Sequence, residues 1–176
     1  MRVRAMVVLA IWRMCLLAKV PALRQKWRMT RPAPSARADY PYLMPIQTRW
    51  LDNDVYGHVN NTVHYTWFDT AANAWLIDQG LLSPSDGAII GVMVASGCTY
   101  FSEISYPQVV HLGVRIAKIG GSSVRYEFGC FAGDAQTSAA DGTFTHVYVD
   151  AASRRPVPLP DAWRAKMAAL TSSETP

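Results

Sequence analysis

The stretch Asp52-Asn53-Asp54-Val55-Tyr56-Gly57-His58-Val59-Asn60-Asn61 decides how this chain folds, because a long helix begins where it ends. Asn60 or Asn61 can cap that helix with a side-chain oxygen, and Gly80 stands where a C-terminal cap is expected. The spacing predicts a helix of about 18 residues, roughly 27 Å long. Apolar residues recur along it at steps of three and four, at Tyr65, Phe68, Ala72, Trp75 and Leu76. Its opposite side is also largely apolar, so the helix must be enclosed.

The rest of the chain has the pattern of strands joined by short turns. Gly120-Gly121 and Asp141-Gly142 are typical turn sequences. A short helix is expected from Pro160 to about Leu170. We predict five strands, at residues 43–51, 88–101, 110–117, 124–130 and 144–150. Short turns between successive strands favour antiparallel pairing, so the predicted fold class is α+β, an antiparallel five-stranded sheet packed against one long helix.

Charge is distributed unevenly along the chain. Nine of the 17 Lys and Arg residues lie in residues 1–38, which contain no acidic residue. The remaining eight are outnumbered by all 13 Asp and Glu residues, so the part expected to fold is acidic. A nucleic-acid-binding domain is therefore not indicated.

We divide the chain into a basic N-terminal extension, residues 1–40, that is disordered or wrongly assigned, a folded domain, 41–170, and a flexible tail, 171–176. Arg13 interrupts the apolar run near the start, so no stretch reaches the roughly 18 residues of a membrane span. The extension has three interpretations: a targeting or secretory leader, a basic amphipathic surface segment, or a start codon assigned too early. The last is favoured, with Met14 or Met29 as the first residue, because residues 30–38 resemble a natural tail.

Cysteine and histidine spacing indicates neither a disulfide framework nor a metal site. Cys15, Cys98 and Cys130 form no CxxC pair, and the histidines form no HxH or HExxH motif. We expect no metal and no cofactor. The cysteine usage fits a reducing compartment, so a cytoplasmic location is expected, with a targeting role of the N-terminus left open.

The motif before the helix has the residue types that acyl transfer needs. Asp54 lies a few residues upstream of a helix N-terminus, where free backbone N–H groups and the helix dipole can polarise a carbonyl oxygen. A carboxylate there can attack a thioester or activate water. A loop of turn and cap residues without any chemistry is the open alternative. Asp52 is expected to hold the loop by local hydrogen bonds.

The run from Arg49 to Asn61, followed by Tyr65, resembles the signature of the 4-hydroxybenzoyl-CoA thioesterase-like family of hotdog-fold acyl-CoA thioesterases. The likeness extends to residues 100–107 and 118–123, and it covers roughly residues 43–165. It implies a hotdog fold in which the sheet wraps the long helix. It also implies that two subunits join their sheets edge to edge, as a homodimer or homotetramer, with the active sites at the subunit interface.

The resemblance places the catalytic aspartate on Asp54, as nucleophile or general base. The backbone N–H of Asn61 would bind the thioester oxygen. Gly57, His58 and Asn60 would shape the substrate-binding loop. Arg115, Lys118 and Arg125 have two readings, contacts to the phosphates of coenzyme A or solvated charges on a strand face. The expected function is hydrolysis of an acyl-CoA to a free acid and coenzyme A. An acyl-carrier-protein thioesterase, a hotdog hydratase and a non-catalytic acyl-binding module remain alternatives.

Overall fold

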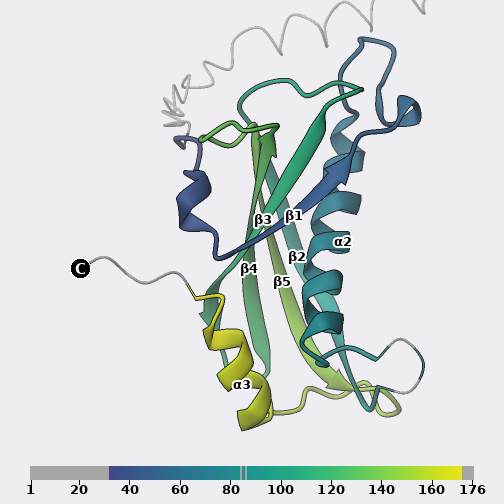
Figure 1. Cartoon of the computed structure of the whole chain (residues 1–176). Coiled ribbons are helices and arrows are strands. Elements are labelled where there is room, and N and C mark those ends of the chain that lie inside the picture. The colour runs from purple at the N-terminus through teal and green to yellow at the C-terminus, as the bar shows by residue number, and fades with distance from the viewer. Residues whose placement is uncertain (1–31, 84, 86, 172–176) are drawn as a thin grey trace, which may run out of the picture. The chain divides into compact units, whose positions relative to one another are not determined.

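The computed structural model describes residues 32–83, 85 and 87–171. Most of the predicted N-terminal extension and nearly all of the predicted C-terminal tail lie outside these residues. Figure 1 shows the described elements. The helices are two short 3-10 helices, η1 (Arg37–Asp39) and η2 (Trp50–Asp52), and two α-helices, α2 (Asn61–Asp78) and α3 (Asp161–Ala168). The strands are β1 (Tyr42–Gln47), β2 (Ile89–Tyr100), β3 (Val109–Ile119), β4 (Ser123–Ala132) and β5 (Ala140–Asp150).

The five strands form one antiparallel sheet in the order β1-β3-β4-β5-β2, so β1 and β2 are its edges. α2 runs along one face of the sheet (Figure 1) and packs on β3 and β4. The turn predicted at Gly120-Gly121 joins β3 to β4. The predicted fold class, an antiparallel five-stranded sheet around one long helix, is confirmed.

The core is centred on aromatic rings between α2 and the sheet. The Phe68 ring on α2 stacks on Phe128 of β4 at a centroid distance of 5.0 Å. Phe144 of β5 contacts Phe128 edge to face at 4.9 Å. Opposite Phe68, β5 has Gly142, where any Cβ atom would overlap the Phe68 ring. The glycine therefore lets the helix approach the sheet closely.

The predicted ends of α2 are also confirmed. The Asn60 side chain accepts a hydrogen bond from the Thr62 N–H and caps the helix. After the helix, Gly80 has φ +64°, a conformation that glycine adopts without strain. Seven of the 18 helical residues are buried: His64, Trp67, Phe68, Ala71, Ala72, Trp75 and Leu76.

Two expectations at strand ends are wrong. The first strand stops at Gln47 rather than Leu51, and the chain then turns through η2, leaving Trp50 and Leu51 exposed. Asp141-Gly142 is not a turn, because β5 already begins at Ala140. The side chain of Asp141 is instead used on the outer face of the sheet, where it accepts hydrogen bonds from Ser35.

Residues 33–40, which the sequence placed with the N-terminal extension, pack on the outer face of the sheet. The Tyr40 ring lies against Gly113 of β3 and Gly129 of β4, where a Cβ atom on either glycine would overlap it. Its hydroxyl is 2.9 Å from Ser35 Oγ. Burial raises the pKa of Tyr40 to about 12. This segment is therefore part of the folded structure.

The close approach of α2 to β5 predicts a cost for any side chain at position 142. Gly142→Ala should lower the free energy of unfolding by about 1–3 kcal/mol, because the new methyl group must displace the Phe68 ring. Gly121→Ala, with open space around its Cβ position, should change it by less than about 0.5 kcal/mol. Urea unfolding of both variants checks this, and equal costs would contradict the packing described.

Candidate active site

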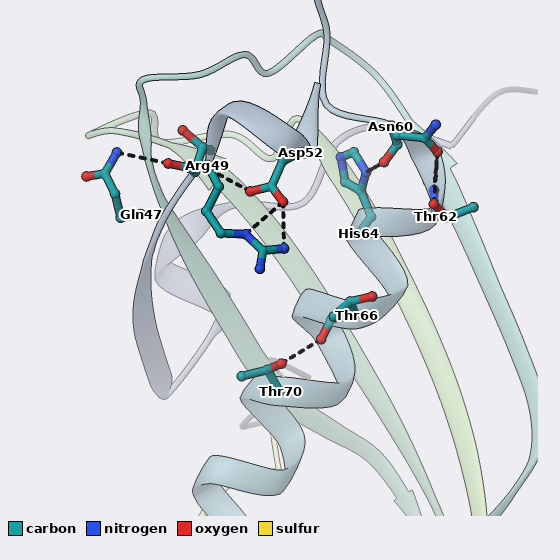
Figure 2. Close-up of polar contacts among 9 residues, drawn as sticks. Gln47, Arg49, Asp52, Asn60, Thr62, His64, Thr66 and Thr70 are labelled. Carbon is teal, nitrogen blue, oxygen red and sulfur yellow. Dashed lines mark hydrogen bonds and ion pairs between the residues drawn. The ribbon is translucent and has the colours of Figure 1, made fainter. Parts of the chain in front are cut away.

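The loop before α2 is fixed by a buried carboxylate. Asp52 is only 1% exposed, and its Oδ2 accepts a hydrogen bond from the Arg49 N–H at 2.7 Å. Its Oδ1 accepts from Arg49 Nε at 3.0 Å and Nη2 at 2.7 Å, so the guanidinium folds over the carboxylate, as Figure 2 shows. The interpretation of Asp52 as the residue that holds the loop is confirmed.

Backbone hydrogen bonds fold the motif into a tight hairpin. The Asn60 N–H donates to the Asp52 carbonyl at 2.8 Å, and the Asp54 N–H donates to the His58 carbonyl at 2.8 Å. Gly57 closes the turn with φ +87°, a conformation that favours glycine. Asp54 is thereby held beside the segment that leads directly into α2.

Asp54 has one carboxylate oxygen committed to the loop. Its Oδ1 accepts a hydrogen bond from the Tyr56 N–H at 2.8 Å. Within the described part of the chain, Oδ2 has no hydrogen-bond partner. The side chain is half-buried. The hairpin thus orients the carboxylate through one oxygen and leaves the other available.

The first N–H groups of α2 are used unequally. Asn60 Oδ1 accepts from the N–H and the hydroxyl of Thr62 at 3.0 and 2.9 Å, and the Asn60 carbonyl accepts from the Val63 N–H at 3.0 Å (Figure 2). The Asn61 N–H has no acceptor among the described residues. A free N–H at the positive end of an 18-residue helix is suited to bind a developing oxyanion.

The segment after β2 encloses the hairpin from the other side. The Ile104 carbonyl accepts from the Val59 N–H at 2.7 Å, and the Tyr106 N–H donates to Asn53 Oδ1 at 3.1 Å. Glu103 Oε2 lies 3.2 Å from His58 Nε2. Sequence reasoning marked residues 100–107 only as similar to the family, and it missed these contacts because they join residues about 45 positions or more apart.

Tyr100 and His64 contact the backbone where the hairpin meets the start of α2. The Tyr100 hydroxyl donates to the Asn61 carbonyl at 3.1 Å. Its ring meets His64 edge to face at 5.1 Å, and His64 Nδ1 lies 3.3 Å from the Asn60 carbonyl (Figure 2). Burial lowers the pKa of His64. A neutral imidazole therefore packs behind the start of α2 and fixes its position.

A cavity of about 250 Å³ lies between β1 and α2. One hydroxyl group in the cavity wall, Thr70 Oγ1, donates a hydrogen bond to the Thr66 carbonyl at 2.7 Å (Figure 2). The guanidinium of Arg49 lies at its edge, bound to Asp52. The lining residues are Met44, Ile46, Gln47, Arg49, Thr66, Trp67 and Thr70.

Other candidate sites receive little support. In the described part of the chain, no cluster of three or more His, Cys, Asp or Glu side chains could hold a metal ion. No described helix is long and apolar enough to cross a membrane. Arg115 is paired with Glu127 at 2.9 Å and lies 3.6 Å from Asp39. Its charge is thus already matched on the outer face.

The structure brings all five sequence-predicted site residues into one junction between the hairpin and α2. They are Asp54, Gly57, His58, Asn60 and Asn61. Their catalytic and binding roles remain predictions.

Comparison with protein families identifies the superfamily of this chain. Residues 48–167 match the model of the thioesterase-like superfamily. The chain belongs to this superfamily. Solved structures agree: the PA5185 protein from Pseudomonas aeruginosa strain PAO1 is 46% identical, with a TM-score of 0.77 over 81% of this chain and 99% of that one. No curated protein sequence matches.

Two further solved structures that resemble this thioesterase-like protein are themselves named thioesterases. A thioesterase from Thermus thermophilus, complexed with coenzyme A and Zn, is 30% identical, with a TM-score of 0.64 over 75% of this chain and 95% of that one. A 1,4-dihydroxy-2-naphthoyl-CoA thioesterase from Synechocystis is 17% identical, with a TM-score of 0.66 over 72% and 95%. The second likeness concerns the fold alone.

The buried histidines predict how stability depends on pH. Burial lowers the native pKa of His64 and of His146 on β5 below the ordinary value of 6.5. Below about pH 6.5 the unfolded chain therefore binds more protons than the native one, and stability falls as the pH falls. The free energy of unfolding, measured in urea, should decrease from about pH 7.5 to about pH 5.5. The decrease should be smaller in His64→Gln; an unchanged pH dependence in that variant would contradict the assignment.

Proposed function

We propose that this thioesterase-like protein hydrolyses acyl-CoA thioesters to a free carboxylic acid and coenzyme A. One observation carries the proposal: the hairpin holds the Asp54 carboxylate, with Oδ2 available, beside the start of α2, where the Asn61 N–H lacks an acceptor among the described residues. A carboxylate and an oxyanion donor are the two groups that thioester hydrolysis requires.

In this proposal the thioester oxygen accepts a hydrogen bond from the Asn61 N–H, which stabilises the negative charge that forms on it. Asp54 then acts in one of two ways. As nucleophile, it attacks the carbonyl carbon, the C–S bond breaks, and water hydrolyses the resulting anhydride. As general base, it removes a proton from water, and the hydroxide attacks the carbonyl carbon before the thiolate leaves. Both routes yield the same acid and thiol.

The neighbouring residues would position the substrate. Gly57 exposes backbone to the ligand, Asn60 fixes the first turn of α2 and His58 lies at the rim with Glu103. Coenzyme A as carrier is supported by the thioesterase from Thermus thermophilus, which is 30% identical and was solved in complex with coenzyme A. An acyl carrier protein is the alternative carrier.

We further propose that two copies join through β2. An exposed edge strand offers a row of unpaired backbone groups, and charges or prolines usually protect such edges. β2 has 12 residues with neither, and Val92, Met93 and Val94 are 39%, 41% and 58% exposed. The other edge, β1, has six residues and contains Pro45. Tyr100 at the end of β2 reaches Asn61, so pairing here would bring the partner close to the active site.

Removing the Asp54 charge should abolish most hydrolysis. Asp54→Asn should lower kcat/KM for acyl-CoA by about 100-fold or more, because the amide neither attacks nor accepts a proton. Release of free thiol from a panel of short, long and aromatic acyl-CoAs measures this. Asp78→Asn, an exposed acid at the other end of α2, serves as the control and should keep native activity. Full activity of Asp54→Asn would contradict the role of Asp54 as nucleophile or general base. Turnover only with carrier-protein thioesters would show that the substrate is carried by an acyl carrier protein and not by coenzyme A.

The dimer proposal makes a separate prediction about β2. Val94→Lys should shift the protein from dimer toward monomer, because pairing would bring like charges together and bury an ammonium group. Leu43→Lys, a matched change on the β1 edge where Leu43 is 37% exposed, should leave the dimer intact. Light scattering after gel filtration gives the molecular mass. Dissociation by the Leu43 variant alone would place the interface at β1 instead.

A further inference from the structure

The peptide group between Asn60 and Asn61 carries the proposed oxyanion donor, and the atoms around it are bonded to three separate parts of the chain. The Asn60 N–H donates to the Asp52 carbonyl at 2.8 Å. The Asn60 side chain accepts from the Thr62 N–H at 3.0 Å. The Asn61 carbonyl accepts from the Tyr100 hydroxyl at 3.1 Å. The Asn61 N–H, which has no acceptor in the described part of the chain, is therefore held in place without being used.

The hydrogen bond from Tyr100 is not one that the helix itself needs. A carbonyl group along an α-helix accepts from the N–H four residues later, and a carbonyl oxygen has two lone pairs. The Tyr100 hydroxyl therefore adds a second hydrogen bond to the Asn61 carbonyl. Tyr100 is the last residue of β2 and follows Asn61 by 39 positions. This bond thus joins the start of α2 to the end of a strand in the sheet.

Two further contacts hold Tyr100 itself. Its backbone lies in the ladder between β2 and β5, opposite Ala140. Its ring meets the buried imidazole of His64 edge to face at a centroid distance of 5.1 Å. His64 Nδ1 lies 3.3 Å from the Asn60 carbonyl, which can only accept, so Nδ1 carries the hydrogen in this contact (Figure 2). The two side chains therefore contact the carbonyl groups on both sides of the Asn61 N–H.

An oxyanion donor is most effective when it is aligned before the negative charge develops. A backbone N–H that must first be reoriented loses part of the stabilisation that it gives to the transition state. The neutral thioester oxygen of the bound substrate gains less from the same donor than the developing oxyanion does. Loss of alignment therefore lowers kcat and leaves KM nearly unchanged. Side chains that hold the N–H in this alignment act on the rate without touching the substrate.

We propose that Tyr100 is a positioning residue for the reaction. Its hydroxyl holds the peptide between Asn60 and Asn61 so that the N–H is aimed at the thioester oxygen, and His64 supports the Tyr100 ring from behind. This inference rests on the proposed function. It gives the end of β2 a role in the reaction that the motif before α2 does not contain, and that role is exerted through the backbone.

Tyr100→Phe tests the proposal because it removes the hydroxyl and keeps the ring against His64. It should lower kcat for acyl-CoA hydrolysis by about 2- to 10-fold, the range expected for one hydrogen bond, and change KM by less than about 2-fold. Tyr40→Phe is the matched control, since it also loses one partly buried hydrogen bond, to Ser35 Oγ on the outer face. It should keep the native kcat. A native kcat in Tyr100→Phe, a raised KM with kcat unchanged, or an equal loss of kcat in Tyr40→Phe overturns the proposal.

A second measurement needs no turnover. The infrared stretching frequency of the carbonyl group in a bound ketone analogue of an acyl-CoA reports the hydrogen bond to its oxygen. This frequency should be lower in the native protein and in Tyr40→Phe than in Tyr100→Phe. Equal frequencies in the native protein and Tyr100→Phe overturn the positioning role. If no thioester releases thiol while the frequency still depends on the Tyr100 hydroxyl, the proposed function fails and the positioning of the Asn61 N–H stands.

Discussion

The buried Asp52 carboxylate is the interaction on which the rest of the site depends. The carboxylate accepts hydrogen bonds from the Arg49 N–H and guanidinium, and the backbone carbonyl of Asp52 accepts one from the Asn60 N–H. Asn60 in turn caps α2, so the same residue that anchors the loop also determines where the helix starts. Because α2 is enclosed by the sheet, its first turn cannot shift without disturbing the aromatic core around Phe68.

Two acids only two positions apart therefore have different environments. Asp52 is buried and saturated with hydrogen bonds, whereas Asp54 is half-buried and keeps one oxygen without a partner among the described residues. Both oxygens of Asp52 are occupied by hydrogen bonds from Arg49, so neither is available to a substrate in this arrangement. This difference is the reason that we propose Asp54, and not Asp52, as the reactive acid.

The sequence was sufficient for features governed by local chemistry. The three- and four-residue spacing, Asn60 and Gly80 predicted the length of α2, and the Asp-rich motif predicted the polar turn before it. Features that depend on distant partners were not predictable in this way. Asp141-Gly142 has the composition of a turn, but Phe68 requires a glycine there and Ser35 uses the aspartate, so the pair lies within β5. The contacts of Tyr100, Glu103 and Tyr106 around the hairpin arise from long-range packing and leave no local signal.

The central claim is that the Asn61 N–H and the Asp54 carboxylate act on the same carbonyl group. It can be tested by a crystal structure of the protein with a non-hydrolysable ketone analogue of an acyl-CoA, in which a CH2 group replaces the thioester sulfur and the carbonyl group is kept. The carbonyl oxygen of the analogue should lie within hydrogen-bond distance of the Asn61 N–H, and Asp54 Oδ2 should face the carbonyl carbon directly or through one water. If the analogue bound with its carbonyl away from the start of α2, or with Asp54 turned from it, Asp54 and the Asn61 N–H would not act on one carbonyl group.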